Sequence, residues 1–448
     1  MNIKKNHEFM ERLRCIFRIA LPLIIQGLVF QLQNLTDKGF LGNQDTRYVS
    51  AVGAAQMPYL ATVSCLVAMN TGLIIIVARK FGAKKEGEIA AFVKSSIFYN
   101  LLLGIGVFFL WFFWVRPILS FFQIDSTVIH YSIDYIRICS IYLLVVGVDS
   151  SLQAMLHGMG ETKPIMYSGF IKVGLNVVLS WVLIFGKFGF PALSVNGAAI
   201  GTVVANLVSF VYLLLYCFVY QKKKYLLGIW NREWFQIRSY LKVVRLGIPV
   251  GLEYLLWNFS NLILIRFING FSFQDMAIYS FAFGMQCIVY VIFEGTSKAA
   301  LTLIGQNIGA GNEKEANRFF YTSILVNFTI VSIACVCFLF FAKPILDLFS
   351  NDSYVILNGA PYLKLIGIIM FPQSMTIICA NAIRANGNTK WMLLTQALGS
   401  VIVISVSYLL IKVLHMNMVA IYITLFLDEL IRGVINLLYY RKKYGVVN

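Results

Sequence analysis

The feature that most constrains this chain is a series of long apolar runs separated by short polar segments. A helix needs about 20 mostly apolar residues to cross the hydrocarbon core of a bilayer, and lipid leaves no partner for unpaired backbone groups. The apolar runs are residues 15–40, 50–77, 94–115, 133–157, 164–186, 195–220, 242–269, 276–305, 319–342, 356–384, 391–413 and 418–440. We therefore predict an all-α integral membrane protein with twelve transmembrane helices.

The composition agrees with a lipid environment. The chain is 59% hydrophobic and 13% charged, whereas soluble domains carry about 25% charged residues. Its net charge of +17 does not indicate a nucleic-acid partner, because the Lys and Arg residues form short clusters between apolar runs instead of following one face of a domain. We expect the lipid bilayer as a partner and no nucleic acid.

The basic clusters also predict the orientation, because positive loops stay in the cytoplasm. One set of helix ends holds Lys4, Lys5, Arg12, Arg14, Arg79, Lys80, Lys84, Lys85, Lys163, Lys222, Lys223, Lys224, Arg232, Arg238, Lys314, Arg318, Lys390, Arg441, Lys442 and Lys443. The opposite ends hold few: Arg47, Arg116, Lys187, Lys343 and Lys412. We predict a multi-pass protein of the inner (plasma) membrane with both termini in the cytoplasm.

Three landmarks recur at one offset. They are the Pro near the start of the first and seventh helices, and the Gly-containing loops after helices two and eight and after helices four and ten. The offsets, 249−22, 309−82 and 387−160, all equal 227. We predict a parallel repeat of two pseudo-symmetric six-helix lobes, with an N-terminal lobe over 1–220, a cytoplasmic linker over 221–241 and a C-terminal lobe over 242–448. Two equivalent bundles around a cleft are typical of alternating-access transporters.

The cysteines do not indicate a metal site or disulfides. All eight lie in apolar stretches and none has CxxC spacing, so we interpret them as small packing residues. We expect no metal and no cofactor. The chain also has no DDxxD, no HxxxxD and no intramembrane His pair, which disfavours an integral membrane transferase.

At these landmarks the sequence resembles the multidrug and toxic compound extrusion (MATE) family, prokaryotic type, over nearly its whole length. The residues that carry the resemblance are Pro22, Gln33 to Asp37, Leu41-Gly42, Gly72, Gly82 to Lys84, Gly158 to Lys163, Asn176, Leu183 to Gly186, Pro191, Asn196 to Ala199 and Gly305 to Asn312. The resemblance implies a secondary-active exporter.

Asp37 is the first candidate for coupling transport to an ion. It lies near the outer end of the first helix, where desolvation favours a neutral carboxyl group. The resemblance implies the same role for Asp37 and surrounds it with Tyr135, Gln153, Asn176 and Ser180. The family often has a second Asp where this chain has Ser180, and a lone carboxylate suits a proton better than Na⁺, which wants several oxygens.

Glu253 is the second coupling candidate, and its repeat partner is Gln26 (253−227). In some branches of the family a Glu one turn further on, at Trp257 here, and an Asp at the position of Gln373 hold the cation, so this site is not matched residue by residue. Three roles remain open for Glu253: a functional role in coupling, a structural partner for Arg266, or a polar residue that lines the cavity.

The remaining candidates line the predicted cleft or bend its helices. The cleft candidates are Gln26, Gln33, Asn34, Trp257, Gln373, Glu294 and Lys298. The i,i+4 spacing of Glu294 and Lys298 also predicts an internal ion pair. Two positions remain open for the Lys172 side chain: near Asp37, or at the cytoplasmic surface. Asp428, Glu429 and Arg432 are interpreted as contacts within the bundle. Pro22 and Pro249 each remove a helix hydrogen bond and predict hinges.

We therefore expect a proton-coupled antiporter that exports amphipathic, cationic small molecules by rocker-switch alternating access, acting as a monomer. The runner-up keeps the fold and changes the cargo to a lipid-linked sugar or a peptide natural product, which would be exported or flipped. Relatives of that kind line the cleft with several cations, and Lys172, Arg266 and Lys298 keep this alternative open.

Overall fold

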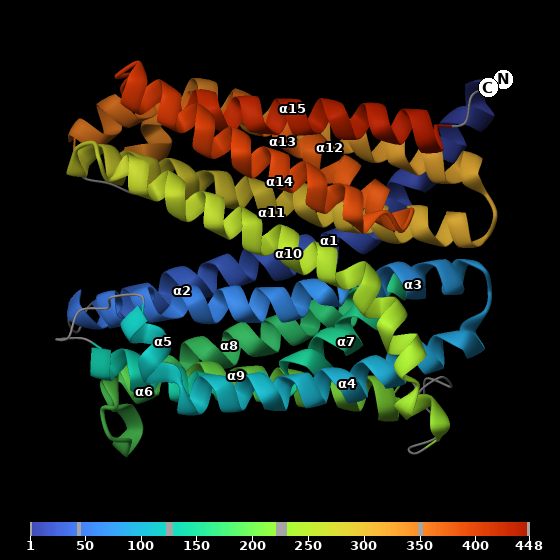
Figure 1. Ribbon diagram of the computed structural model, residues 1–448, viewed down its shortest axis with the longest axis horizontal. Coiled ribbons are helices and arrows are strands. Elements are labelled where there is room, and N and C mark those ends of the chain that lie inside the picture. The colour runs from blue at the N-terminus through green and yellow to red at the C-terminus, as the bar shows by residue number, and fades with distance from the viewer. Residues whose placement is uncertain (1, 43–45, 122–128, 221–230, 348–352, 446–448) are drawn as a thin grey trace. The chain divides into compact units, whose positions relative to one another are not determined.

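The computed structural model describes residues 2–42, 46–121, 129–220, 231–347 and 353–445, and those residues are helical with short connections and no strand (Figure 1). The first seven predicted spans are α1 (Asn2–Gly42), α2 with α3 (Thr46–Met69, Thr71–Gly82), α4 (Glu86–Phe113), α6 with α7 (Ile129–Ser140, Leu143–Met159), α8 (Lys163–Phe185), α9 (Ser194–Leu215) and α10 (Ile237–Ile268). The last five are α11 (Phe273–Gly309), α12 (Glu313–Asp347), α13 (Ser353–Ala385), α14 (Thr389–Tyr408) and α15 (Val419–Tyr444). The predicted all-α fold is confirmed.

Two spans are broken and five short helical segments are added among the described residues, one of which is the π-helical turn Tyr216–Tyr220 directly after α9. Asn70 interrupts the span made by α2 and α3, and the span of α6 and α7 bends by 49°. The helix α5 (Val115–Phe121) follows α4 directly, while 3-10 turns lie at Lys187–Gly189 and Arg232–Phe235. The π-helical turn Leu409–Val413 extends α14.

In the described part of the chain, ten helices are long and apolar enough to cross a membrane, and the bent pair makes eleven. The twelfth span, α15, is interrupted by charge, because Asp428, Glu429 and Arg432 lie in its middle. All three are buried, so they face protein and not lipid. Length and composition thus make the chain a multi-pass membrane protein.

The chain forms two compact units whose borders lie inside helices. The N unit is Ile25–Gly251, and the C unit is Met1–Ile24 with Leu252–Asn448. The two borders are repeat equivalents, because 251−24 is 227, and each falls two residues after a proline of α1 or α10. The division into 1–220, 221–241 and 242–448 stays a prediction, and residues 221–230 lie outside the described part.

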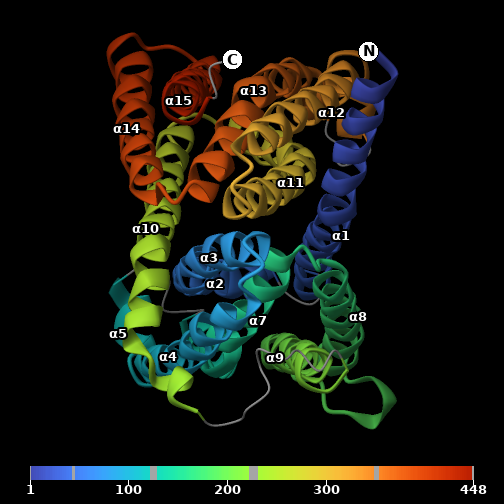
Figure 2. The same cartoon turned by 90° about the vertical axis from the view of Figure 1, so that its right-hand side faces the viewer.

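In the N unit, α8 packs on α9, α4 packs on α7, and the first part of α10 joins α3 and α4 (Figure 2). Gly247 of α10 lies so close to Met69 that a Cβ atom there would meet Met69 Cα at 2.9 Å. Tyr240 of α10 donates a 2.9 Å hydrogen bond to Asn100 Oδ1 of α4. These contacts make the first half of α10 part of the N unit.

The C unit has the equivalent arrangement. Its helices α11, α12, α13 and α15 pack together, and the first part of α1 lies against α11 and α12 (Figure 2). The backbone of Gly295 in α11 is close to that of Ala20, with 3.5 Å between a Cβ built on Gly295 and Ala20 O. Arg12 donates to Glu315 Oε1 at 3.1 Å. The helix α1 is unbroken through Pro22, and the predicted hinges at Pro22 and Pro249 stay predictions.

Candidate functional site

Asp37 lies near the end of α1 in the N unit, on a helix face turned partly toward α6. The Gln33 side chain, one turn earlier, hydrogen-bonds to its carboxylate. The buried Tyr135 of α6 is close enough to interact electrostatically with Asp37. Asp37 Oδ1 is buried and has no hydrogen-bond donor in the described part of the chain. The structure thus brings together Asp37, Gln33 and Tyr135, all candidates from the sequence.

Asn176 and Ser180 form a second polar group of the N unit, where α8 meets α9. Asn176 donates a 3.0 Å hydrogen bond to Thr202 Oγ1, and Gly201 lets α9 approach Ser180 closely. Asn176 Oδ1 and Ser180 Oγ are buried without partners in the described residues. Neither side chain hydrogen-bonds to Asp37 there, so the structure does not join them directly to the first group.

Gln153 hydrogen-bonds to Asp149 and not to Asp37, the acid beside which the resemblance placed it. Its Nε2 donates to Asp149 Oδ2 at 3.0 Å, one turn away on α7. Asp149 is 7% exposed and was not among the residues predicted from the sequence. The signal was present, because a carboxylate in the middle of the apolar run 133–157 is expensive in a membrane and marks a functional candidate.

Lys172 also departs from both predicted positions. Its ammonium lies 5.3 Å from the Phe30 ring centroid and 5.9 Å from that of Tyr142. Its electrostatic partner is Asp149 and not Asp37. Lys172 therefore belongs to a cluster built from α1, α7 and α8 of the N unit.

In the C unit, Glu253 of α10 is held by Arg384 of α13. Arg384 Nη2 lies 2.6 Å from Glu253 Oε1. The partner suggested by the sequence, Arg266, is not the one found. Glu253 Oε2 is buried without a donor in the described residues, so the Glu253 carboxylate is only half satisfied.

A network of charges fills the interior of the C unit around α15. Arg432 donates two hydrogen bonds to Asp428, at 2.8 and 2.7 Å, and one of 2.8 Å to Gln396 Oε1. Its Nη2 also lies 3.1 Å from Glu429 Oε1. The interpretation of these residues as contacts within the bundle is confirmed. Gln373 extends the network, because it accepts from Gln286 at 2.9 Å and hydrogen-bonds to Glu429.

The other cleft candidates each have different neighbours in the structure. Lys298 and Glu294 form the predicted i,i+4 ion pair at 3.0 Å. The Gln26 side chain packs on Gly169 of α8, where a Cβ atom would meet Gln26 Cγ at 2.8 Å. Trp257 is 43% exposed. The Asn34 side chain lies outside the described part of the chain.

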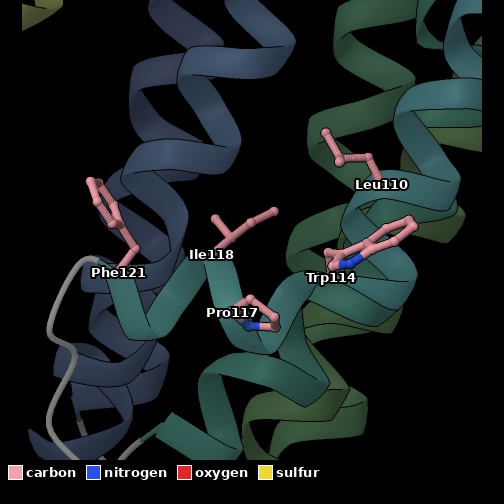
Figure 3. A pocket seen from close by; sticks show the side chains of 5 residues that line it. All are labelled: Leu110, Trp114, Pro117, Ile118 and Phe121. Atoms are coloured by element: carbon pink, nitrogen blue, oxygen red, sulfur yellow. The ribbon is translucent and has the colours of Figure 1, made fainter.

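An apolar hollow of about 460 Å³ lies between the end of α4 and α5 (Figure 3). Its lining residues are Leu110, Trp114, Pro117, Ile118 and Phe121. It contains none of the polar candidates and no charged side chain, so it is not the candidate site.

The fold and these buried polar groups define a class of protein: a multi-pass helical membrane transporter built from two six-helix repeats. The chain belongs to the MatE family, whose profile matches residues 22–182 and 249–409. The two matches have the same offset at both ends, because 249−22 and 409−182 both equal 227. The predicted internal repeat is thereby confirmed, and the chain is a transporter of this family and not an enzyme.

Similar proteins agree with this family. The chain is 23% identical over 436 residues to a probable multidrug resistance protein NorM of Thermotoga maritima, covering 95% of this chain and 91% of that protein. It is 24% identical over 389 residues to a probable multidrug resistance protein YoeA of Bacillus subtilis, covering 84% and 82%. A crystal structure of MATE in the straight conformation superposes with a TM-score of 0.88 at 19% identity, covering 96% of both chains.

Proposed function

We propose that this chain is a secondary-active exporter of amphipathic, cationic small molecules, driven by protons. It would work by rocker-switch alternating access, as a monomer in the cell membrane with both termini in the cytoplasm. The names of the relatives, multidrug resistance proteins, support the cargo class. The observation that carries the coupling is the buried Asp37 Oδ1 without a donor in the described residues.

Asp37 has the chemistry of a proton carrier. A buried carboxylate oxygen without a donor is costly as an ion and is stabilised when it binds a proton. Gln33 and Tyr135 beside it are neutral, and the position at which the family often has a second Asp is Ser180 in this chain. A hard cation such as Na⁺ would want more oxygens and more negative charge than this group offers.

The free energy available from each gradient determines which one should drive efflux. One pH unit supplies about 1.4 kcal/mol per proton, and 100 mV adds roughly 2.3 kcal/mol per net charge moved. When one proton enters for each monovalent cation that leaves, no net charge moves. Efflux of such a cation should therefore follow the pH gradient and be insensitive to the membrane potential.

Transport by purified protein in liposomes tests the proposal. An imposed pH gradient should drive efflux of a monovalent organic cation, and Asp37→Asn should abolish it while the protein stays folded. Asp134→Asn is the matched control, because Asp134 is exposed on α6 of the same unit, and it should transport normally. Efflux that follows a sodium gradient and ignores pH, or undiminished efflux by Asp37→Asn, would overturn the proposed coupling.

A further inference from the structure

The buried carboxylate of Asp149 is satisfied on one oxygen only. The Tyr142 hydroxyl donates to Oδ2 at 3.2 Å and Gln153 Nε2 donates to the same Oδ2 at 3.0 Å. Asp149 Oδ1 is buried and has no hydrogen-bond partner in the described part of the chain. The proposed coupling mechanism does not use Asp149, so this half-satisfied carboxylate needs its own explanation.

The Lys172 ammonium occupies the space next to this carboxylate. It lies over the ring faces of Phe30 and Tyr142, where a cation is attracted by the ring quadrupole. It attracts Asp149 electrostatically, but the two do not reach ion-pair distance among the described contacts. Tyr142 has two functions here, because its hydroxyl orients Asp149 and its ring faces the ammonium.

Two aromatic faces and one carboxylate are the chemistry that recognises an organic ammonium group. We name Asp149, Phe30 and Tyr142 the ammonium cage. Phe30 is 41% exposed and Lys172 is half-buried, so the cage is open on that side. Lys172 is joined to α8 by four flexible methylene groups, which allow its ammonium to leave without movement of the helix.

We propose that the ammonium cage binds the cationic head of an amphipathic monovalent amine or quaternary ammonium compound, and that Lys172 is a tethered competitor that fills the cage until such a ligand displaces it. The proposal rests on the proposed export of cationic small molecules and names the chemical group that is recognised. When the cage holds no ligand, the tethered cation places a positive charge near the buried Asp149 carboxylate and partly compensates its negative charge.

Binding of benzyltrimethylammonium to the purified full-length protein, measured by isothermal titration calorimetry, tests the cage. Lys172→Met removes the competitor and should tighten binding about tenfold, as expected for one relieved cation–π and charge contact. Asp149→Asn in the Lys172→Met background should abolish that gain. Lys163→Met is the matched control at the exposed start of α8 and should leave the affinity unchanged.

A second variant of Lys172 distinguishes an effect on binding from a folding defect. Lys172→Gln removes the charge and keeps a polar end, and it should tighten binding in the same direction. Unchanged or weaker binding by both folded variants would overturn the proposal, as would a gain that survives Asp149→Asn. Binding of benzoate to the wild type that Lys172→Met abolishes would also overturn it, because Lys172 would then be an anion ligand.

This binding experiment is independent of the coupling experiment. Normal pH-driven efflux with no tightening by Lys172→Met would reject the cage and leave the proposed function intact. Tightening as expected in a protein that shows no pH-driven efflux would reject proton coupling and leave the cage.

Discussion

Glu253 and Arg384 join α10 to α13 through a single hydrogen bond of 2.6 Å between Oε1 and Nη2. Their side chains are only 11% and 12% exposed. The other carboxylate oxygen, Oε2, and the Arg384 Nε are buried without partners in the described residues. The pair is therefore desolvated and geometrically incomplete, a combination in which each charge depends on the other.

Removal of one partner should destabilise the protein more than removal of both. Arg384→Met leaves Glu253 as an uncompensated buried charge, at a cost of about 3–5 kcal/mol. The double variant Glu253→Gln/Arg384→Met should recover most of that loss and retain pH-driven efflux, because coupling is assigned to Asp37. Thermal unfolding in detergent and liposome efflux measure the two effects.

Lys298→Met is the control for this pair, because the Lys298 side chain is 44% exposed. It should cost less than about 1 kcal/mol. If the stable double variant fails to transport, Glu253 has a functional role that the ion pair does not explain.

Gly201 should tolerate no larger residue. A Cβ atom there would lie 2.8 Å from Ser180 Oγ and 2.9 Å from Ser180 N, so Gly201→Ala should push α9 away from α8 and destabilise the protein by about 2 kcal/mol. Gly174→Ala on α8 is the matched control, because no atom lies within 4 Å of its Cβ position. Equal melting temperatures for the two variants would contradict the close packing at Gly201.

Pro22 should matter for transport more than for stability. Pro22→Ala restores a backbone donor and removes the steric conflict of the proline ring with the preceding turn, so it should slow efflux at least several-fold while the melting temperature stays the same or rises. Pro164→Ala is the control, because Pro164 stands at the start of α8 where proline is tolerated. Unchanged efflux by Pro22→Ala would remove the case for a hinge.

The turn at Arg232–Phe235 should be anchored in a pH-dependent way. Lys94 Nζ donates to Glu233 Oε2 at 2.7 Å, and this hydrogen bond lowers the pKa of Glu233 from its usual 4.5. A lowered folded-state pKa means that the stabilisation is complete above pH 4.5 and is lost as the pH falls through the lower folded value.

The measurement is the difference in thermal stability between the wild type and Glu233→Gln. At pH 7 the variant should be less stable by about 2 kcal/mol, because Lys94 is 2% exposed and loses its charged acceptor. The difference should shrink once the pH is well below 4.5. Glu86→Gln, an exposed substitution on α4, should show no such trend, and a difference independent of pH would contradict the pairing.

The sequence alone determined the twelve spans, the 227-residue repeat and the Glu294–Lys298 pair. These features are local, because apolar length fixes a span and the helix period fixes an i,i+4 contact. The resemblance at ordered landmarks led to the family. Asp37, Gln33 and Tyr135 could be proposed in the same way, since an acid in an apolar run is conspicuous.

Only the tertiary structure decided which helices face each other. Arg384 lies 131 residues from Glu253, and no local pattern selects it over Arg266. The sequence likewise gave no reason to place Lys172 beside Asp149 and the Phe30 ring instead of near Asp37. The sequence also did not predict that α1 and α10 each divide between the two units, after Ile24 and after Gly251. The reason is that the apolar run continues through each border. Side-chain direction and helix packing, which hydropathy does not encode, determine all three.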